Sequence, residues 1–248
     1  MIYEIINEIK SHLKKIAPHL TEEQRSRMYA ILNSSNSNFV GYGIKHSDLE
    51  KYVRDIQNKY NLSYHEASQI FKVLIESDVH DEKMAGIFLL NRYKKEFNNE
   101  TIDMFYDIIP HYYDTWAVTD TSMIRVIGPF LGKKDNYQLA EKTIKKWSNA
   151  ENLWVKRASL VILLKLIMIR KEFDADYVFK FVEKISKNSE EYIQKGIGWL
   201  LKTCSKYEPD LIFNYLMNYK DRFPRLILRY ASEKLSKEKR AQILKKPN

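Results

Sequence analysis

Apolar residues recur along the chain at the three- and four-residue spacing of an amphipathic α-helix. One such run passes through Met84, Ile87 and Leu90 and continues to Tyr93. Because no segment carries a convincing strand pattern, the periodicity predicts an all-α protein. Further helical runs lie within residues 161–168, 179–185 and 197–204.

Short polar breaks separate the helical runs, and short connections favour antiparallel neighbours. The spacing of the breaks indicates pairs of helices in units of roughly 40 residues, as in HEAT-type repeats. The chain has only 7 Gly and 6 Pro among 248 residues, which disfavours a turn-rich β architecture. We therefore expect a single domain over residues 1–248, folded as a helical-repeat solenoid, an α-α superhelix. The breaks lie at residues 98–99, 132–135, 149–152, 187–189 and 206–209.

Three helix starts carry a capping box, in which a Ser or Thr and a Glu or Gln three residues later satisfy free backbone N–H groups. A segment rich in Ser, Asn and Gly at residues 34–43 is the clearest loop. We expect this loop to separate an N-terminal helical pair, within residues 1–35, from the repeats that follow. The capping boxes are Thr21 with Gln24, Ser47 with Glu50, and Ser63 with Glu66.

The chain carries 41 Lys and Arg residues against 32 Asp and Glu residues, a formal net charge of +9. A cationic surface attracts polyanions, because neutralising phosphates releases counterions. Nucleic acid is therefore the first candidate partner, an anionic membrane is the second, and a basic soluble protein with neither partner is the simplest alternative. On a solenoid we expect the basic residues to line the concave face, where a rod of B-form DNA can lie.

Cysteine usage and hydropathy make a reducing compartment the default expectation. Cys204 is the single cysteine, which excludes an internal disulfide and a cysteine-based metal cluster. Its helical pattern predicts a buried small residue rather than a nucleophile. The acidic start of the chain is not typical of a signal peptide, and the apolar stretch 160–169 is too short to span a bilayer. We expect a cytoplasmic protein.

Conventional catalytic motifs are missing from the sequence, but tryptophan, aspartate and arginine occur at repeat spacing. Trp116 and Asp120 stand four positions apart, which puts both on one face of a helix. Arg157 lies 41 positions after Trp116, and Trp199 lies 42 positions after Arg157. Each interval matches one repeat unit, so the four side chains can line the same face of a solenoid.

At these residues the sequence resembles the AlkD-like DNA alkylation repair glycosylases, which are built from HEAT-like repeats. The similarity runs from about Gly41 to near the C-terminus. The resemblance implies that Trp116, Asp120 and Trp199 surround the damaged nucleotide and that Arg157 holds a nearby phosphate. It also implies that the lesion is handled without insertion into a base-flipping pocket. The matching stretches are residues 115–120, 152–158 and 192–202.

The chemistry implied for Asp120 is reasonable in itself. A purine alkylated at N3 or N7 is cationic, so it leaves without protonation while the sugar becomes oxocarbenium-like. The Asp120 carboxylate can stabilise that cation and orient water at C1′. Trp116 and Trp199 offer electron-rich rings to the cationic nucleotide. We therefore expect a monofunctional glycosylase that acts on cationic lesions such as 3-methyladenine and 7-methylguanine, and poorly on neutral lesions such as uracil.

The expected partner is double-stranded DNA carrying alkylated bases. Arg157 can clamp a phosphate through its planar fork, and Lys195 and Lys202 are further candidates for phosphate contacts. We expect a monomer with no metal, no organic cofactor and no obligate protein partner. The remaining tryptophans, Trp147 and Trp154, are assigned to the core.

Two other functions fit the same pattern. Many members of the family have a Trp before the active-site Trp and an Asp after it, whereas this chain has Thr115 and Ala117. That departure supports a non-catalytic repeat protein that binds damaged or distorted DNA and releases no base. A protein-interaction scaffold is the third hypothesis, since helical solenoids often serve that purpose.

Overall fold

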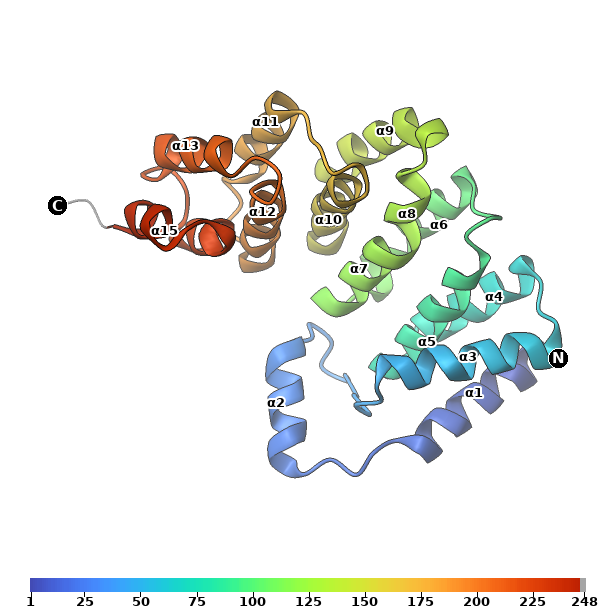
Figure 1. Cartoon of the computed structure of the whole chain (residues 1–248). Coiled ribbons are helices and arrows are strands. Elements are labelled where there is room, and N and C mark those ends of the chain that lie inside the picture. The colour runs from blue at the N-terminus through green and yellow to red at the C-terminus, as the bar shows by residue number, and fades with distance from the viewer. Residues whose placement is uncertain (246–248) are drawn as a thin grey trace. The chain divides into compact units, whose positions relative to one another are not determined.

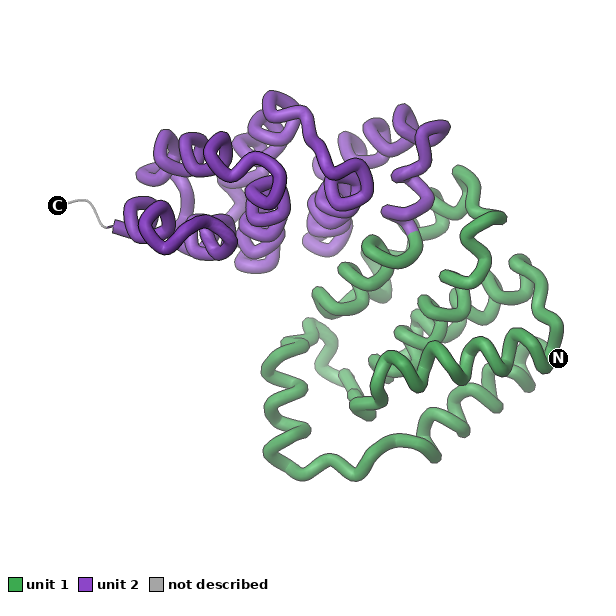
Figure 2. Tube along the Cα trace, in the orientation of Figure 1, with its two compact units in different colours: residues 1–126 green, residues 127–248 purple. Residues whose placement is uncertain are grey.

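The computed structural model of the chain, described here for residues 1–245, is all-helical, as the periodicity predicts. Within those residues the β pairing is limited to one isolated parallel bridge between Val40 and Val79. No helix in the described part of the chain has both the length and the apolar character needed to cross a membrane. The chain forms two compact units, residues 1–126 and 127–248 (Figure 2).

Unit 1 is built around α5 (His80–Leu90), every residue of which is buried. Helices α3 and α4 pack against α5, and α1 packs against both α4 and α5 (Figure 1). The short helix α7 also packs on α5. The helices of unit 1 are α1 (Ile2–Ile16), α2 (Glu22–Leu32), α3 (His46–Tyr60), α4 (Tyr64–Ile75), α5, η1 (Asn91–Tyr93), α6 (Asn99–Tyr112) and α7 (Trp116–Ser122).

A π-helical turn, η2 (Met123–Ile127), follows α7 directly. Pro129 explains the irregular turn, because it has no N–H to donate to the carbonyl of Arg125 and its ring crowds that carbonyl. An α-helical register cannot continue unchanged through this point, so α7 is limited to seven residues.

Unit 2 is built around α10 (Leu153–Arg170), which packs against α8, α9 and α12. The next layer is α12 against α14. Gly198 permits that close approach, because a Cβ at this position would lie 2.4 Å from the Cβ of Tyr230. The helices of unit 2 are α8 (Gly128–Leu131), η3 (Lys134–Asn136), α9 (Tyr137–Ser148), α10, α11 (Ala175–Ile185), α12 (Glu191–Cys204), α13 (Pro209–Tyr219), α14 (Arg225–Ala231), η4 (Ser232–Lys234) and α15 (Lys237–Leu244).

Two of the three predicted capping boxes are confirmed, at Thr21 for α2 and at Ser63 for α4. The third prediction is wrong: α3 begins at His46, one residue before Ser47, and its N-cap is Lys45. Ser47 therefore already has helical backbone and cannot act as the N-cap, which needs an extended conformation. The predicted loop at residues 34–43 is confirmed as a non-helical connection between α2 and α3.

The predicted single domain, the superhelix and its basic concave face concern both units together, and they stay predictions. The three core assignments made from the sequence, all in unit 2, are confirmed. Trp147 and Trp154 are buried, and burial raises the pKa of the Cys204 thiol to about 12, which makes a nucleophilic role at neutral pH unfavourable.

Candidate functional site

Helix α7 of unit 1 carries Trp116 and Asp120. Thr115 is the N-cap of this helix, and its side chain accepts a hydrogen bond from the backbone N–H of Val118 at 3.2 Å. The residue that departs from the family pattern at this position is thus a good helix cap. Ala117, the other departure, is also buried.

The Trp116 ring is half-buried, and its position is fixed by a long-range hydrogen bond. Its indole N–H donates to the backbone carbonyl of Ile31, at the end of α2, at 2.9 Å. Because the N–H is engaged in this way, the ring cannot rotate freely, and its π face and edge are the parts left for other contacts. Asp120, one helical turn later, is only 7 % exposed.

A buried ion pair fixes the segment that leads into α7. The Nζ atom of Lys83 on α5 lies 3.0 Å from Oδ2 of Asp114, and it donates a hydrogen bond to the carbonyl of Tyr112 at 2.6 Å. On the other side, the backbone N–H of Ser35 donates to the carbonyl of Asp114 at 2.9 Å. The segment 112–116 is therefore tied to α5 and to the loop after α2.

The neighbours of Lys83 on α5 are also buried and polar. The Asp81 carboxylate accepts hydrogen bonds from the backbone N–H groups of Tyr42 and Ile44, at 2.7 and 2.8 Å. Glu82 accepts a hydrogen bond from the Ser77 hydroxyl at 2.6 Å. Burial lowers the pKa of His80, so its imidazole is neutral at pH 7.

This buried polar cluster is not among the residues predicted from the sequence. Its signal is present, because residues 80–83 are four consecutive polar residues at the start of a helix whose remaining residues are almost all apolar. Such a helix has no polar face to hold charged groups in solvent, so a charge at its start is a candidate for burial. The partner Asp114 lies 31 positions away in the sequence, and no local pattern connects the two residues.

In unit 2, Arg157 lies on α10 and is only 5 % exposed. Its guanidinium donates to the backbone carbonyl of Tyr192, near the start of α12, and lies 5.9 Å from the centre of the Tyr192 ring. Gly196 allows this approach, since a Cβ there would lie 3.0 Å from the side chain of Leu160. Arg157 is thus positioned by contacts with α12 as well as by its own helix.

The other predicted residues of unit 2 lie on α12. The Trp199 ring is half-buried. The Lys195 ammonium lies 2.6 Å from the Glu191 carboxylate, which raises the pKa of Lys195, and the Lys202 ammonium lies 2.8 Å from Glu233. Each of the two lysines therefore already has a carboxylate partner in the folded chain.

The structure therefore brings the predicted residues together in two sets. Trp116 and Asp120 share one helix of unit 1, while Arg157, Lys195, Trp199 and Lys202 lie on adjacent helices of unit 2. The predicted meeting of both sets at one point stays a prediction. Among the described residues, no group of three or more His, Cys, Asp or Glu side chains could hold a metal ion.

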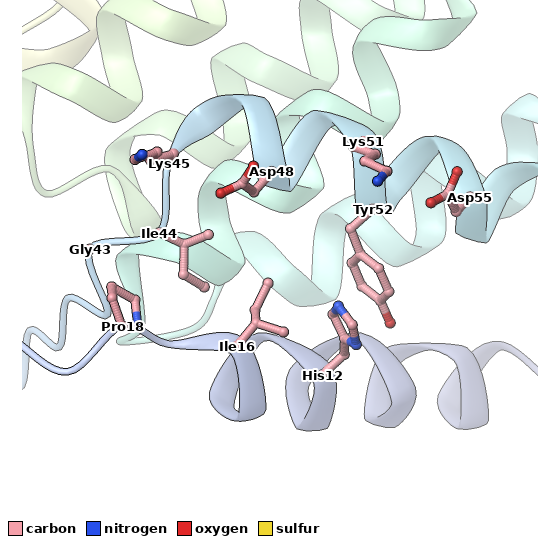
Figure 3. Close-up of a pocket in the computed structure, with 10 residues that line it drawn as sticks. All are labelled: His12, Ile16, Pro18, Gly43, Ile44, Lys45, Asp48, Lys51, Tyr52 and Asp55. Atoms are coloured by element: carbon pink, nitrogen blue, oxygen red, sulfur yellow. The ribbon is translucent and has the colours of Figure 1, made fainter.

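A hollow of about 490 Å³ lies in unit 1, between the end of α1 and the start of α3 (Figure 3). Its lining mixes basic and acidic side chains, including Lys45, Lys51, Asp48 and Asp55. The predicted site residues do not line it. Mixed charge of this kind gives no preference for an anionic ligand, and we assign the hollow no part in the site.

Comparison with known proteins identifies a family and a shared fold. The sequence model of the family described as "DNA alkylation repair enzyme" matches residues 9–235. A solved structure described as a predicted DNA alkylation repair enzyme from Enterococcus faecalis is 20% identical, with a TM-score of 0.73, over 88% of this chain and 97% of that one.

A second solved structure, smu.31 from Streptococcus mutans UA159, is 19% identical with a TM-score of 0.54, over 76% of this chain and 100% of that one. At these identities the two likenesses show a common fold. A search of the curated proteins finds no match.

Proposed function

The chain belongs to the DNA alkylation repair enzyme family, and from that membership we propose that it is a monofunctional DNA glycosylase. Its proposed reaction is hydrolysis of the N-glycosidic bond of cationic N3- and N7-alkylated purines in duplex DNA. The family match over residues 9–235 is the observation that carries the proposal. The proposed enzyme is a cytoplasmic monomer that needs no metal or organic cofactor.

The chemistry of the substrate limits what the protein has to supply. A 3-methyladenine or 7-methylguanine base is positively charged in DNA, so it departs as a neutral molecule without a general acid. Positive charge then develops on the sugar as the C1′–N bond stretches. A fixed negative charge close to C1′ stabilises this transition state more than the ground state, which is what accelerates the reaction.

Asp120 is the residue proposed for this electrostatic role. The carboxylate lies on a helix that is capped by Thr115 and tied to α5, and it is 7 % exposed. A carboxylate shielded from water interacts more strongly with a cation than a fully solvated one does. A water molecule hydrogen-bonded to Asp120 would then add to C1′, and the proton that it loses passes to solvent or to the carboxylate.

The remaining residues are proposed to hold the nucleotide. Trp116 offers the π face of a ring that its hydrogen bond to Ile31 keeps in place, and Trp199 offers a second ring. Arg157, Lys195 and Lys202 are proposed to contact phosphates of the same DNA. Because such contacts release counterions, binding should weaken steeply with salt.

The test is to incubate the purified chain with methylated duplex DNA and to identify any free base by chromatography and mass spectrometry. We expect 3-methyladenine and 7-methylguanine to be released, and we expect no uracil from a uracil-containing duplex of the same sequence. The uracil duplex is the matched control, because it presents a neutral base of poor leaving ability. Release of uracil at the same rate would contradict the role of lesion charge.

The alternative function is a non-catalytic repeat protein that binds damaged or distorted DNA. Thr115 and Ala117, where many family members have Trp and Asp, are the observation that favours it. It predicts salt-dependent binding to methylated duplex with no free base after long incubation. The base-release assay and a binding titration, made on the same preparation, distinguish the two functions.

A further inference from the structure

The Lys83–Asp114 pair is an unusual feature of unit 1. The side chains of Lys83 and Asp114 are only 4 % and 8 % exposed, and their charged atoms lie 3.0 Å apart. Removing two charges from water is costly, and a buried ion pair often stabilises a fold no better than two apolar residues of similar size. Burial of the pair is therefore weak evidence that it is there for stability alone.

The contacts of the pair lie on both sides of the turn between α6 and α7. Lys83 holds the carbonyl of Tyr112 as well as the carboxylate of Asp114, and these two residues flank Tyr113. The carbonyl of Asp114 in turn accepts hydrogen bonds from the N–H and hydroxyl groups of Ser35. Two residues later, the indole of Trp116 is bonded to Ile31.

The turn helps to set the direction of helix α7, which also packs on α5. The helix has seven residues and runs directly into the π-helical turn η2, so a long regular helix does not set its axis. Asp120 lies one turn beyond Trp116 on the same helix. A rotation of the segment 112–116 would displace both side chains together.

We propose that Lys83 is a positioning residue that orients Trp116 and Asp120 by fixing the turn before α7, an inference that rests on the proposed glycosylase function for its effect on rate. Lys83 acts through Asp114 and the Tyr112 carbonyl, and it takes no part in bond cleavage. Its effect on the placement of Trp116 is independent of the reaction.

Three variants distinguish an effect of Lys83 on the position of Trp116 from an effect on the stability of the fold. Lys83→Met removes the ammonium and leaves the Asp114 carboxylate buried. The double variant Lys83→Met with Asp114→Leu removes both charges at similar volume, so stability is expected to recover. Glu82→Gln is the matched control, because Glu82 is the adjacent buried charge on α5 and instead contacts Ser77 and Lys10.

Two measurements are made on each variant. The first is the ¹H–¹⁵N spectrum of the indole groups, in which the 4 tryptophans give four signals and Trp116→Phe identifies the signal of Trp116. The second is the single-turnover rate of 7-methylguanine release, measured beside the dissociation constant for the same duplex. The indole spectrum needs no catalytic activity.

We expect both Lys83 variants to shift the Trp116 indole signal and to lower the release rate about 10- to 100-fold, with DNA affinity close to that of the wild type. The double variant is expected to stay slow although its stability recovers, and Glu82→Gln to behave as the wild type does. A double variant with the wild-type rate and an unmoved indole signal would overturn the proposal. If the wild-type chain releases no base, the proposed function fails, and the indole spectrum alone decides whether Lys83 positions Trp116.

Discussion

The central helices of the two units are buried in different ways. In unit 1, α5 starts with His80, Asp81, Glu82 and Lys83, all of them buried and most of them bonded to connecting segments. In unit 2, the buried side of α10 is apolar along most of its length, and Arg157 is its buried charge. Hydrogen bonds and an ion pair thus hold the segments around α7, whereas the packing of apolar side chains holds the centre of unit 2. We therefore expect backbone placement beside Trp116 and Asp120 to depend on the Lys83 charge.

The largest expected difference comes from the buried ion pair. Lys83→Met leaves an uncompensated carboxylate in the interior, so we expect the free energy of unfolding to fall by about 4 kcal/mol. Urea denaturation, followed by circular dichroism, measures the change. The double variant with Asp114→Leu should recover most of the loss. If the single variant were as stable as the wild type, Lys83 would not be compensating the buried charge of Asp114.

An apolar truncation should be nearly as costly in unit 2. Leu164 on α10 is 1% exposed, and Leu164→Ala is expected to lower the free energy of unfolding by about 3 kcal/mol through lost burial and a residual cavity. The hydrogen-exchange rates of peptides from α10 should be higher in this variant than in the wild type. No second charge substitution can restore this loss, in contrast to the Lys83 pair. A loss below about 1 kcal/mol would mean that α10 is not tightly packed.

Lowering the pH should reduce the stability of unit 1 more than that of unit 2. All histidines of the chain lie in unit 1, and burial lowers the pKa of His80 below its ordinary 6.5. Below pH 6.5 the unfolded chain binds a proton at His80 that the folded chain does not, so stability falls as the pH falls. The loss at pH 5.5, relative to pH 7.5, is expected to be at most roughly 1–2 kcal/mol from this one group. The histidines are His12, His19, His46, His65, His80 and His111.

The variant His80→Gln isolates that contribution. The fall in its stability between pH 7.5 and pH 5.5 should be smaller than that of the wild type by the contribution of His80. Hydrogen exchange at the two pH values shows where the loss occurs. If acid raised hydrogen exchange equally in the peptides of α5 and α10, the loss of stability could not be assigned to unit 1.

The smallest expected effect is the stability lost when a helix N-cap is removed. Asn152 caps α10 by accepting hydrogen bonds from the N–H groups of Trp154 and Val155, whereas the N-cap of α5, Val79, offers no side-chain bond. Asn152→Ala should therefore cost about 1 kcal/mol, and Val79→Ala should cost no capping energy. Thermal unfolding of both variants, compared with the wild type, checks the difference.

The sequence predicts the helices well because apolar periodicity and short polar breaks are local features. The capping boxes at Thr21 and Ser63 are local in the same way, and they are confirmed. The prediction for Ser47 is wrong because the Ser-x-x-Glu pattern also occurs inside a helix, and here the helix begins one residue earlier.

The candidate site is predictable only in part. The four-residue spacing of Trp116 and Asp120 places both on α7, as observed. The Lys83–Asp114 pair and the bond from Trp116 to Ile31 join residues on different elements, and no spacing rule connects them. The burial of Arg157 depends on the close approach of α12, which Gly196 permits through tertiary packing.

The single-turnover rate of 7-methylguanine release from methylated duplex DNA, measured for Asp120→Asn, tests the central claim most directly. The matched control is Asp103→Asn, the same substitution at an exposed position on α6 of the same unit. We expect Asp120→Asn to lower the rate by about 100-fold or more, with DNA binding unchanged, and Asp103→Asn to match the wild type. A rate for Asp120→Asn equal to that of the control would contradict the role given to Asp120 and, with it, the proposed catalytic site.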